Sequence, residues 1–369
     1  MCGKQARVER RARRRLLSRD SVLGTKIRMT SFAIGVDLGL TNLRVAAVGS
    51  DGNVLDRITN GTQMERGRNL VIDQICTDIR TLAAKWERTL PFAGVGIGMP
   101  GIIDMEGGML KDPNLPDWLG YPLREELEQR LGTTVVLEND ANAAALGEKW
   151  LGAGRQVDDL CVLTLGTGVG GGLVLKGRIW HGMTGMAAEL GHITVDPEGV
   201  LCVCGNRGCL EQYASATAIK RMAQEAIAAG HAPELAACMD EEDEPNVKAV
   251  FQMAVQGNAA AAKIFHRVGE SLGLVLANLI NIFNLPMYLL GGGVANAWEA
   301  FAPSMIEEVR RRSFVYVTTN PDEKSNGSIR GRTIVSRALL GSDAGLFGAA
   351  RLPMIAAGLV QPAQELKQG

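Results

Sequence analysis

The sequence predicts a duplicated α/β fold in which two domains face each other across a central cleft. Its 369 residues are enough for two domains of ordinary size. Segments 32–48 and 160–175 share one layout, in which an apolar strand, a turn containing glycine and threonine, and a second strand follow one another. Alternating helical and strand patterns follow each of these hairpins. We therefore expect two halves built on the same plan.

The first half opens as an antiparallel meander. A polar turn at 50–53 joins its second and third strands, as in a hairpin. Apolar residues then recur at helical spacing between Val71 and Trp86. We predict strands at 32–36, 44–48, 54–59, 93–98 and 135–138, and helices at 71–86, 123–131 and 141–151.

The second half repeats the hairpin with a longer glycine turn at 166–172. We predict strands at 161–165, 173–175, 288–290 and 334–336, and helices at 264–283, 297–312 and 344–357. The expected domains are a small N-terminal domain at 31–140 and a larger C-terminal domain at 141–343, with the last helix packing back on the first domain.

Charge is distributed unevenly along the chain, although the net charge is only −1. Residues 1–28 hold eight Arg and two Lys against Glu9 and Asp20. We interpret residues 1–30 as a basic disordered extension or as sequence upstream of a start at Met29; a nucleic-acid or targeting arm is the alternative. No apolar run suits a secretory signal or a membrane span, and we expect no membrane or nucleic-acid partner.

Three of the seven cysteines and one of the four histidines fall within segment 189–211. His192, Cys202, Cys204 and Cys209 form the ligand set that a structural Zn²⁺ site uses. The Cys-x-Cys-x4-Cys spacing differs from the commoner Cys-x2-Cys pair, and three buried thiols are the alternative interpretation. Thiolate ligands need reducing conditions, so we expect a cytoplasmic protein.

Two carboxylates flank this cluster, because Glu189 precedes His192 and Glu211 follows Cys209. A metal-bound histidine keeps an N–H donor on its second ring nitrogen. This donor and the two carboxylates would suit the hydroxyl groups of a sugar.

The pattern Glu189-x-Gly-His192, followed by Cys202-x-Cys204-Gly-x-x-Gly-Cys209-x-Glu211, resembles the signature of the ROK family of sugar kinases and sugar-responsive repressors. The resemblance covers residues 32–357 and implies the actin-like, hexokinase-like (RNase H-like) ATPase fold. It also implies that the histidine binds zinc and touches the sugar, that the cysteines complete the zinc site, and that both glutamates bind sugar hydroxyls.

The resemblance implies an ATP-dependent hexose kinase, with glucose as the first expected substrate and N-acetylmannosamine or fructose as alternatives. A sugar-sensing transcriptional regulator is the second hypothesis, but residues 1–31 show no pair of apolar-periodic helices for a DNA-binding domain. We expect a homo-oligomer, either a dimer or a tetramer.

Two glycine turns, one in each half, can supply backbone N–H donors to phosphate groups. A plain hairpin turn is the alternative for each. Asp37 follows the first strand and can hold Mg²⁺ through water. The proposed nucleotide-binding residues are Asp37, Gly39, Thr41, Asn42, Gly166, Thr167, Gly168, Gly291, Gly292 and Gly293.

Asp140 stands where a strand meets a helix, so from position alone it can be a helix N-cap. The family resemblance instead implies that Asp140 is the catalytic base, and that Asn139, Asn114 and the Gly101 backbone bind sugar hydroxyls. Gly96-x-Gly98-x-x-Gly101 fits a dinucleotide motif, but the residues after it look extended rather than helical.

Leu40 and Asn42 depart from the family pattern, which has glycine and lysine at these two positions of the first turn. Leucine adds a side chain where the backbone would need a positive φ. Polyphosphate therefore stays open as an alternative phosphoryl donor.

Overall fold

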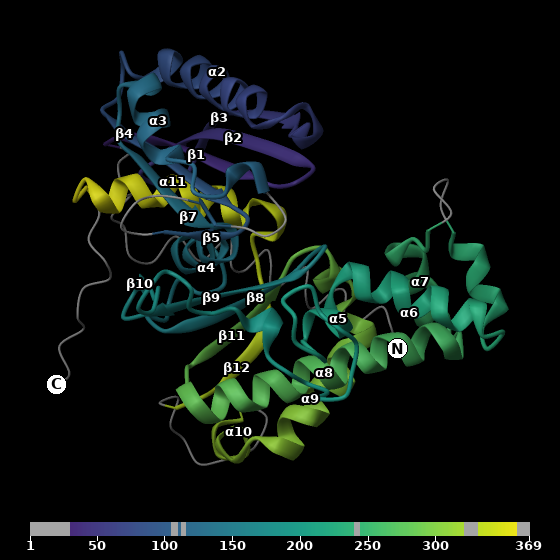
Figure 1. The fold of residues 1–369 in the computed structure, drawn as a ribbon. Helices are drawn as coiled ribbons and strands as arrows, with labels where there is room; N and C mark the ends of the chain where they lie inside the picture. Colours follow the sequence, from purple (N-terminus) through teal and green to yellow (C-terminus); the bar gives the residue numbers. More distant parts are fainter. Residues whose placement is uncertain (1–29, 105–109, 112–115, 240–243, 321–330, 360–369) are drawn as a thin grey trace.

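The computed structural model describes residues 30–104, 110–111, 116–239, 244–320 and 331–359. Two lobes are present, each built around a five-stranded mixed sheet (Figure 1). The predicted basic extension at 1–30 lies outside the described residues, apart from Thr30. No helix in the described segments has both the length and the apolar character needed to cross a membrane.

The first sheet has the strand order β3-β2-β1-β4-β7. Its strands are β1 (Phe32–Leu38), β2 (Asn42–Gly49), β3 (Val54–Gly61), β4 (Phe92–Met99) and β7 (Val135–Asn139). The first three form the predicted antiparallel meander, whereas β4 and β7 run parallel to β1. A two-stranded ribbon, β5 (Ile102–Ile103) with β6 (Leu110–Lys111), follows β4, which confirms extended chain after Gly101.

Helices cover both faces of this first sheet (Figure 1). Apolar side chains of β1 pack on one face with those of α2 (Arg68–Trp86) and α3 (Leu123–Leu131). On the other face α11 (Ala344–Ala356) comes so close that a Cβ on Gly96 would lie 1.9 Å from the Ala349 carbonyl oxygen. Glycine in the strand thus permits backbone contact between sheet and helix.

The second sheet has the strand order β10-β9-β8-β11-β12. Its strands are β8 (Leu160–Leu165), β9 (Val169–Leu175), β10 (Arg178–Ile179), β11 (Met287–Gly291) and β12 (Ile334–Arg337). As in the first sheet, an antiparallel hairpin is followed by two parallel strands on its other side. The predicted duplication is therefore confirmed strand by strand.

The returning strand of this second hairpin begins at Val169, so the prediction of a glycine turn over 166–172 is wrong at its C-terminal end. A Cβ on Gly172 would lie 2.7 Å from the Ala141 carbonyl oxygen, and a Cβ on Gly171 would lie 2.4 Å from that of Ala188. These glycines lie in a strand because the backbone of neighbouring segments packs against both of its faces.

Seven helices of the described chain belong to the second lobe: α4 (Asp140–Trp150), α5 (Glu211–Ala214), α6 (Ala216–Ala228), α7 (Val247–Val255), α8 (Ala259–Phe283), α9 (Trp298–Arg312) and α10 (Phe314–Thr319). The apolar stripe of α8 lies in the core, as its spacing predicts, and packs with α9. A Cβ on Gly273 of α8 would lie 2.5 Å from the Met305 carbonyl oxygen of α9.

Helix α4 links the lobes, because it follows β7 of the first sheet and packs on β9 of the second. It also packs against α11, and both helices contribute a glycine to their contact. A Cβ on Gly147 would lie 2.1 Å from the Ala344 carbonyl oxygen, and a Cβ on Gly348 would lie 1.7 Å from that of Ala143. The two helices therefore touch backbone to backbone.

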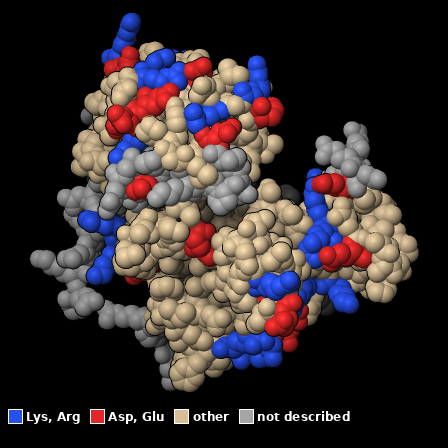
Figure 2. All heavy atoms as spheres, viewed as in Figure 1, with Lys and Arg blue, Asp and Glu red and all other residues tan. Residues whose placement is uncertain are grey.

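Positive and negative side chains are interspersed over the upper lobe in the view of Figure 2. Ion pairs on this lobe include Arg57 with Asp343 at 3.0 Å and Lys85 with Asp56 at 2.6 Å. Because such pairs are exposed to water, each contributes little to stability.

Candidate active site

Asp37, predicted to hold Mg²⁺, and Asp140, predicted to be the catalytic base, lie in one cleft between the two lobes. Strands β1, β4 and β7 run parallel, so their carboxyl ends lie at one edge of the first sheet. Asp37 lies near the end of β1, and Asp140 begins α4 directly after β7. Both line the cleft together with Thr164 of β8 and with Gly291 and Gly292 at the end of β11.

Asp37 is a largely buried carboxyl group with one cationic neighbour. Arg44 lies 3.0 Å from its Oδ2 and also donates to the Ser342 carbonyl oxygen at 2.8 Å. Burial raises the pKa of Asp37 to about 6; Arg44 opposes this rise and the charge of Asp140 adds to it. A divalent cation beside Asp37 would favour its ionised form, since opposite charge lowers a carboxyl pKa.

The helix cap next to Asp140 is supplied by Asn139. The side-chain oxygen of Asn139 accepts hydrogen bonds from the amides of Ala141 and Asn142, at 2.9 and 3.1 Å. Its Nδ2 donates to the Gly101 carbonyl oxygen at 3.1 Å. Asp140 is the first residue of the helix rather than its N-cap, and its Oδ1 accepts from the Ala141 amide at 2.8 Å. The cap interpretation of Asp140 is therefore wrong.

The first glycine turn joins β1 to β2. The Gly39 amide donates to the Asn42 carbonyl oxygen at 2.9 Å, and the Thr62 hydroxyl donates to the Gly39 carbonyl oxygen at 2.7 Å. Thr41, Asn42 and Leu40 are all exposed. Leu40 is not among the described non-glycine residues with positive φ, so leucine causes no backbone strain at this position.

The second glycine turn is supported by one of the glutamates that flank the cysteines. The Gly166 amide donates to the Gly168 carbonyl oxygen at 2.9 Å, with Thr167 between them. Oε2 of Glu211 accepts the Val169 amide at 2.9 Å. A Cβ on Gly168 would lie 2.4 Å from the same carboxylate oxygen. Through this hydrogen bond, Glu211, a predicted sugar ligand, contacts the end of the predicted phosphate-binding turn.

The third glycine segment lies at the end of β11 beside that turn. Gly292 has a φ of +83°, and a Cβ there would lie 2.4 Å from the Leu165 carbonyl oxygen. A Cβ on Gly293 would have no atom within 4 Å. The backbone at Gly292 therefore requires glycine, whereas the space around Gly293 is open to a ligand.

The structure brings the predicted zinc ligands together. One ligand atom from each of His192, Cys202, Cys204 and Cys209 lies within 4.8 Å of the other three. The sulfur atoms of Cys204 and Cys209 are 3.6 Å apart, and the Cys202 sulfur is 3.7 Å from Nδ1 of His192. Four such atoms could hold one metal ion.

The loop that carries these ligands turns at two glycines. Gly205 has a φ of +89° and Gly208 a φ of +68°. A Cβ on Gly208 would lie 1.6 Å from the Asp196 carbonyl oxygen. A larger residue at 208 would move the loop, and the three sulfur atoms with it.

The other predicted sugar contacts lie beside this cluster or next to Asp140. Nε2 of His192, the ring nitrogen that does not face Cys202, lies 4.0 Å from Oε2 of Glu189. Gly101 has a φ of +94° and contacts Asn139 as described above. Asn114 lies outside the described residues.

Two contacts in the site involve residues that the sequence did not single out. Arg44 is the cross-strand partner of Asp37 in the β1–β2 register, so the predicted hairpin could have revealed it. Glu138 lies 2.6 Å from His181 of the second lobe, and residues 43 positions apart give no local signal of such a contact.

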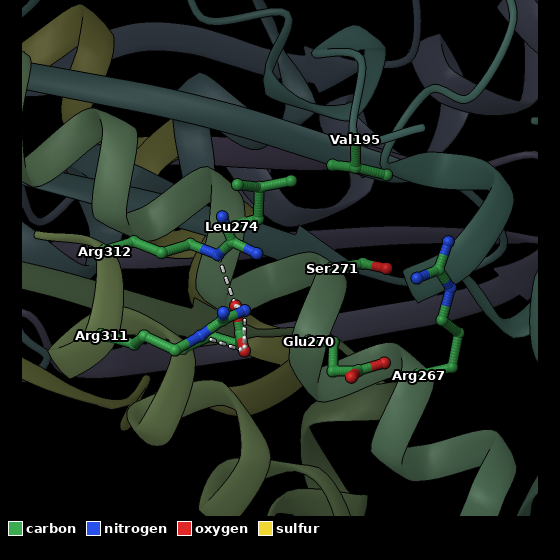
Figure 3. Close-up of a pocket in the computed structure, with 8 residues that line it drawn as sticks. Val195, Arg267, Glu270, Ser271, Leu274, Arg311 and Arg312 are labelled. Carbon is green, nitrogen blue, oxygen red and sulfur yellow. Dashed lines mark hydrogen bonds and ion pairs between the residues drawn. The ribbon is translucent and has the colours of Figure 1, made fainter. Parts of the chain in front are cut away.

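A second hollow lies between α8 and α9, away from the cleft (Figure 3). It is lined by Val195, Arg267, Glu270, Ser271, Leu274, Glu308, Arg311 and Arg312. Arg311 and Arg312 both pair with Glu308, and Arg267 pairs with Asp196 at 3.1 Å. Its cationic groups are thus paired within the protein, and none of the described residues predicted for the site lines it.

Comparison with known proteins identifies the family and the fold of the chain. The ROK family model matches residues 33–354. A glucokinase of Thermotoga maritima is 41% identical over 321 residues, which are 86% of this chain and 96% of that protein. The crystal structure of a ROK family glucokinase from Streptomyces griseus in complex with glucose and AMPPNP aligns with a TM-score of 0.71 and 35% identity, over 87% of this chain and 99% of that one. The ROK hexokinase of Thermus thermophilus aligns with a TM-score of 0.73 and 31% identity, over 89% and 100% of the two chains.

Proposed function

The chain belongs to the ROK family, and we propose that it transfers the γ-phosphoryl group of ATP to glucose, giving glucose 6-phosphate. The observation that carries this function is the cleft that Asp37 and Asp140 of the first half line together with Thr164, Gly291 and Gly292 of the second. Phosphoryl transfer needs donors around the phosphates, a cation and a base near the attacking hydroxyl, and this cleft offers residues for each.

Asp140 is the proposed base. Its carboxylate would accept the proton of the glucose hydroxyl while that oxygen forms a bond to the γ-phosphorus and the bond from phosphorus to the bridging oxygen of ADP breaks. Such a base typically contributes about 10²–10⁴ in rate. Its place as the first residue of α4, directly after the Asn139 cap, supports this role because the cap holds the helix start in position.

The triphosphate would lie against the two glycine turns, at 39–42 and 166–168, with the nucleoside near Gly291, Gly292 and Gly293. Asp37 would hold Mg²⁺ through water, and the cation would neutralise charge on the phosphate oxygens. The burial of Asp37 supports this assignment, since a buried carboxylate gains most from an added positive charge.

The sugar would be held by Glu189, His192 and Glu211 on one side, and by Asn139, Gly101 and Asn114 on the other. Asn139 already uses its oxygen and one N–H within the protein, which leaves its second N–H for a hydroxyl. Site groups that pair with individual hydroxyls discriminate strongly between sugars, because an analogue lacking one hydroxyl leaves its partner unpaired.

We also propose that His192, Cys202, Cys204 and Cys209 hold a structural Zn²⁺. Tetrahedral zinc with Zn–S bonds of about 2.3 Å places sulfur atoms about 3.8 Å apart, and the separation of 3.6 Å between Cys204 and Cys209 fits this value. When bound, the metal would stiffen the loop between Glu189 and Glu211. Because Nδ1 of His192 faces the sulfur atoms, Nε2 would be the N–H donor offered to the sugar.

The proposed boundary between the lobes lies at 140–141, with α11 returning to the first lobe. The contacts of Gly35 and Gly96 with α11 support this division.

ADP release, measured in a coupled assay over glucose, N-acetylmannosamine and fructose, tests the function, with polyphosphate as an alternative donor. We expect turnover with ATP and glucose, and a loss of about 10²–10⁴ in kcat for Asp140→Asn. Glucose binding measured by calorimetry should persist in that variant. Wild-type kcat in Asp140→Asn would exclude Asp140 as the base, and no turnover of any hexose with either donor would exclude the function.

A further inference from the structure

Glu138 is a buried carboxylate two residues before the proposed base. Its side chain is 3% exposed, although it lies beside the cleft. A buried carboxylate is strongly destabilising unless hydrogen-bond donors surround it. The groups that donate hydrogen bonds to Glu138 therefore identify the segments whose positions it fixes.

Three donors surround the two carboxylate oxygens of Glu138. Oε1 accepts the Asn139 amide at 2.9 Å and Nδ2 of Asn142 at 3.0 Å. Both partners belong to the turn from β7 into α4, one on each side of Asp140. Oε2 lies 2.6 Å from Nε2 of His181. Oε1 thus binds the turn between β7 and α4, whereas Oε2 binds a residue outside that turn.

His181 comes from the second lobe. It follows β10, and its backbone oxygen accepts the Ala187 amide at 3.2 Å, within the loop that leads to Glu189. The hydrogen bond with Glu138 raises the pKa of His181, which burial opposes. The pair therefore joins the loop before a proposed sugar-binding glutamate to the turn that carries the proposed base.

We propose that the His181–Glu138 hydrogen bond is a positioning contact that sets the Asp140 carboxylate relative to the sugar bound by the second lobe. Neither residue needs to touch the substrate. His181 acts by donating to Glu138, and Glu138 acts by holding the amides and the side chain on both sides of Asp140. Reaction rates depend steeply on such positioning, since a displacement of about 1 Å can cost about 10² in rate.

This inference rests on the proposed kinase function, and the variants separate the two. His181→Ala removes the donor, whereas His181→Gln keeps an N–H donor at similar reach without the imidazole ring. His266→Ala is a matched control, because His266 faces Glu270 at 3.6 Å on the exposed surface of α8. We expect His181→Ala to lower kcat by about tenfold or more, with KM for ATP unchanged within about twofold. His181→Gln should recover most of kcat, and His266→Ala should match wild type.

Amide hydrogen exchange over residues 135–146 supplies a readout that does not need turnover. The amides of Asn139, Ala141 and Asn142 should exchange faster in His181→Ala and return toward wild-type rates in His181→Gln. If wild type phosphorylates no hexose, the proposed function is wrong. The positioning contact is then tested by amide hydrogen exchange alone, through the comparison of His181→Ala with wild type. Unchanged exchange and kcat in His181→Ala would overturn the inference. A His181→Gln protein that melts like wild type but is as slow as His181→Ala would also overturn it.

Discussion

Replacing Asp37 with asparagine should stabilise the Mg²⁺-free protein above pH 6 while removing its kinase activity. Burial is the largest influence on this carboxyl group and raises its pKa from 3.8 to about 6 in the folded protein. The folded state therefore binds a proton more tightly than the unfolded chain does. The contribution of Asp37 to stability is therefore most favourable below pH 3.8, falls as the pH rises toward 6, and stays lower above it.

The size of the effect follows from the same values. A pKa of about 6 instead of 3.8 corresponds to about 3 kcal/mol of folding free energy lost once Asp37 is ionised. Asparagine cannot ionise, and its oxygen can still accept the hydrogen bond of Arg44. Asp37→Asn should thus be more stable than wild type by up to about 3 kcal/mol at pH 8, and by about half of that at pH 5.

Thermal unfolding at pH 5 and pH 8, in buffer without Mg²⁺ or ATP, measures this difference, and the coupled ADP assay measures activity. Asp56→Asn is the control, because Asp56 is part of an ion pair with Lys85 that lowers its pKa. That variant should be no more stable than wild type. A melting temperature of Asp37→Asn at or below the wild-type value at pH 8 would refute the reasoning, and wild-type activity would refute the role of Asp37.

Three further changes address the metal cluster, the lobe contacts and the sugar site. His192→Ala should lower the zinc content measured by elemental analysis and weaken glucose binding, whereas the exposed His231→Ala should change neither. Gly96→Ala should lower the free energy of unfolding, measured in denaturant titrations, by about 1–3 kcal/mol. The reason is that the added Cβ would lie 1.9 Å from the Ala349 carbonyl oxygen. Equal stability of wild type and variant would contradict that contact. Glu211→Ala should raise KM for glucose about tenfold or more in the ADP assay. The substitution removes a carboxylate and leaves the Val169 amide without its hydrogen-bond acceptor. An unchanged KM would show that Glu211 does not bind the sugar.

Local patterns were enough to predict most strands and the clustering of one histidine with three cysteines. The hairpin layout at 32–48 and 160–175 predicted the duplicated sheets because apolar alternation and turn residues act over short distances. Segment 189–211 predicted the clustering of His192 with three cysteines, since all four ligands lie close together in the chain.

The remaining features depend on contacts between distant segments. Gly170, Gly171 and Gly172 look like a turn, but they form a strand because α4 and the chain near Ala188 press on the two faces of β9. The cap of α4 falls on Asn139 rather than Asp140, and residue type does not decide between these neighbours because both are good caps. The contact between Glu138 and His181 joins the two lobes, so only the folded chain reveals it.

The backbone contact between α4 and α11 sets how closely the two lobes approach each other. At Gly147 and Gly348 no side chain separates the two helices, so a residue with a Cβ at either position would have to push them apart. Because α11 packs on the first sheet and α4 on the second, such a change would widen the space between the lobes. Asp140, at the first turn of α4, would be displaced with that helix.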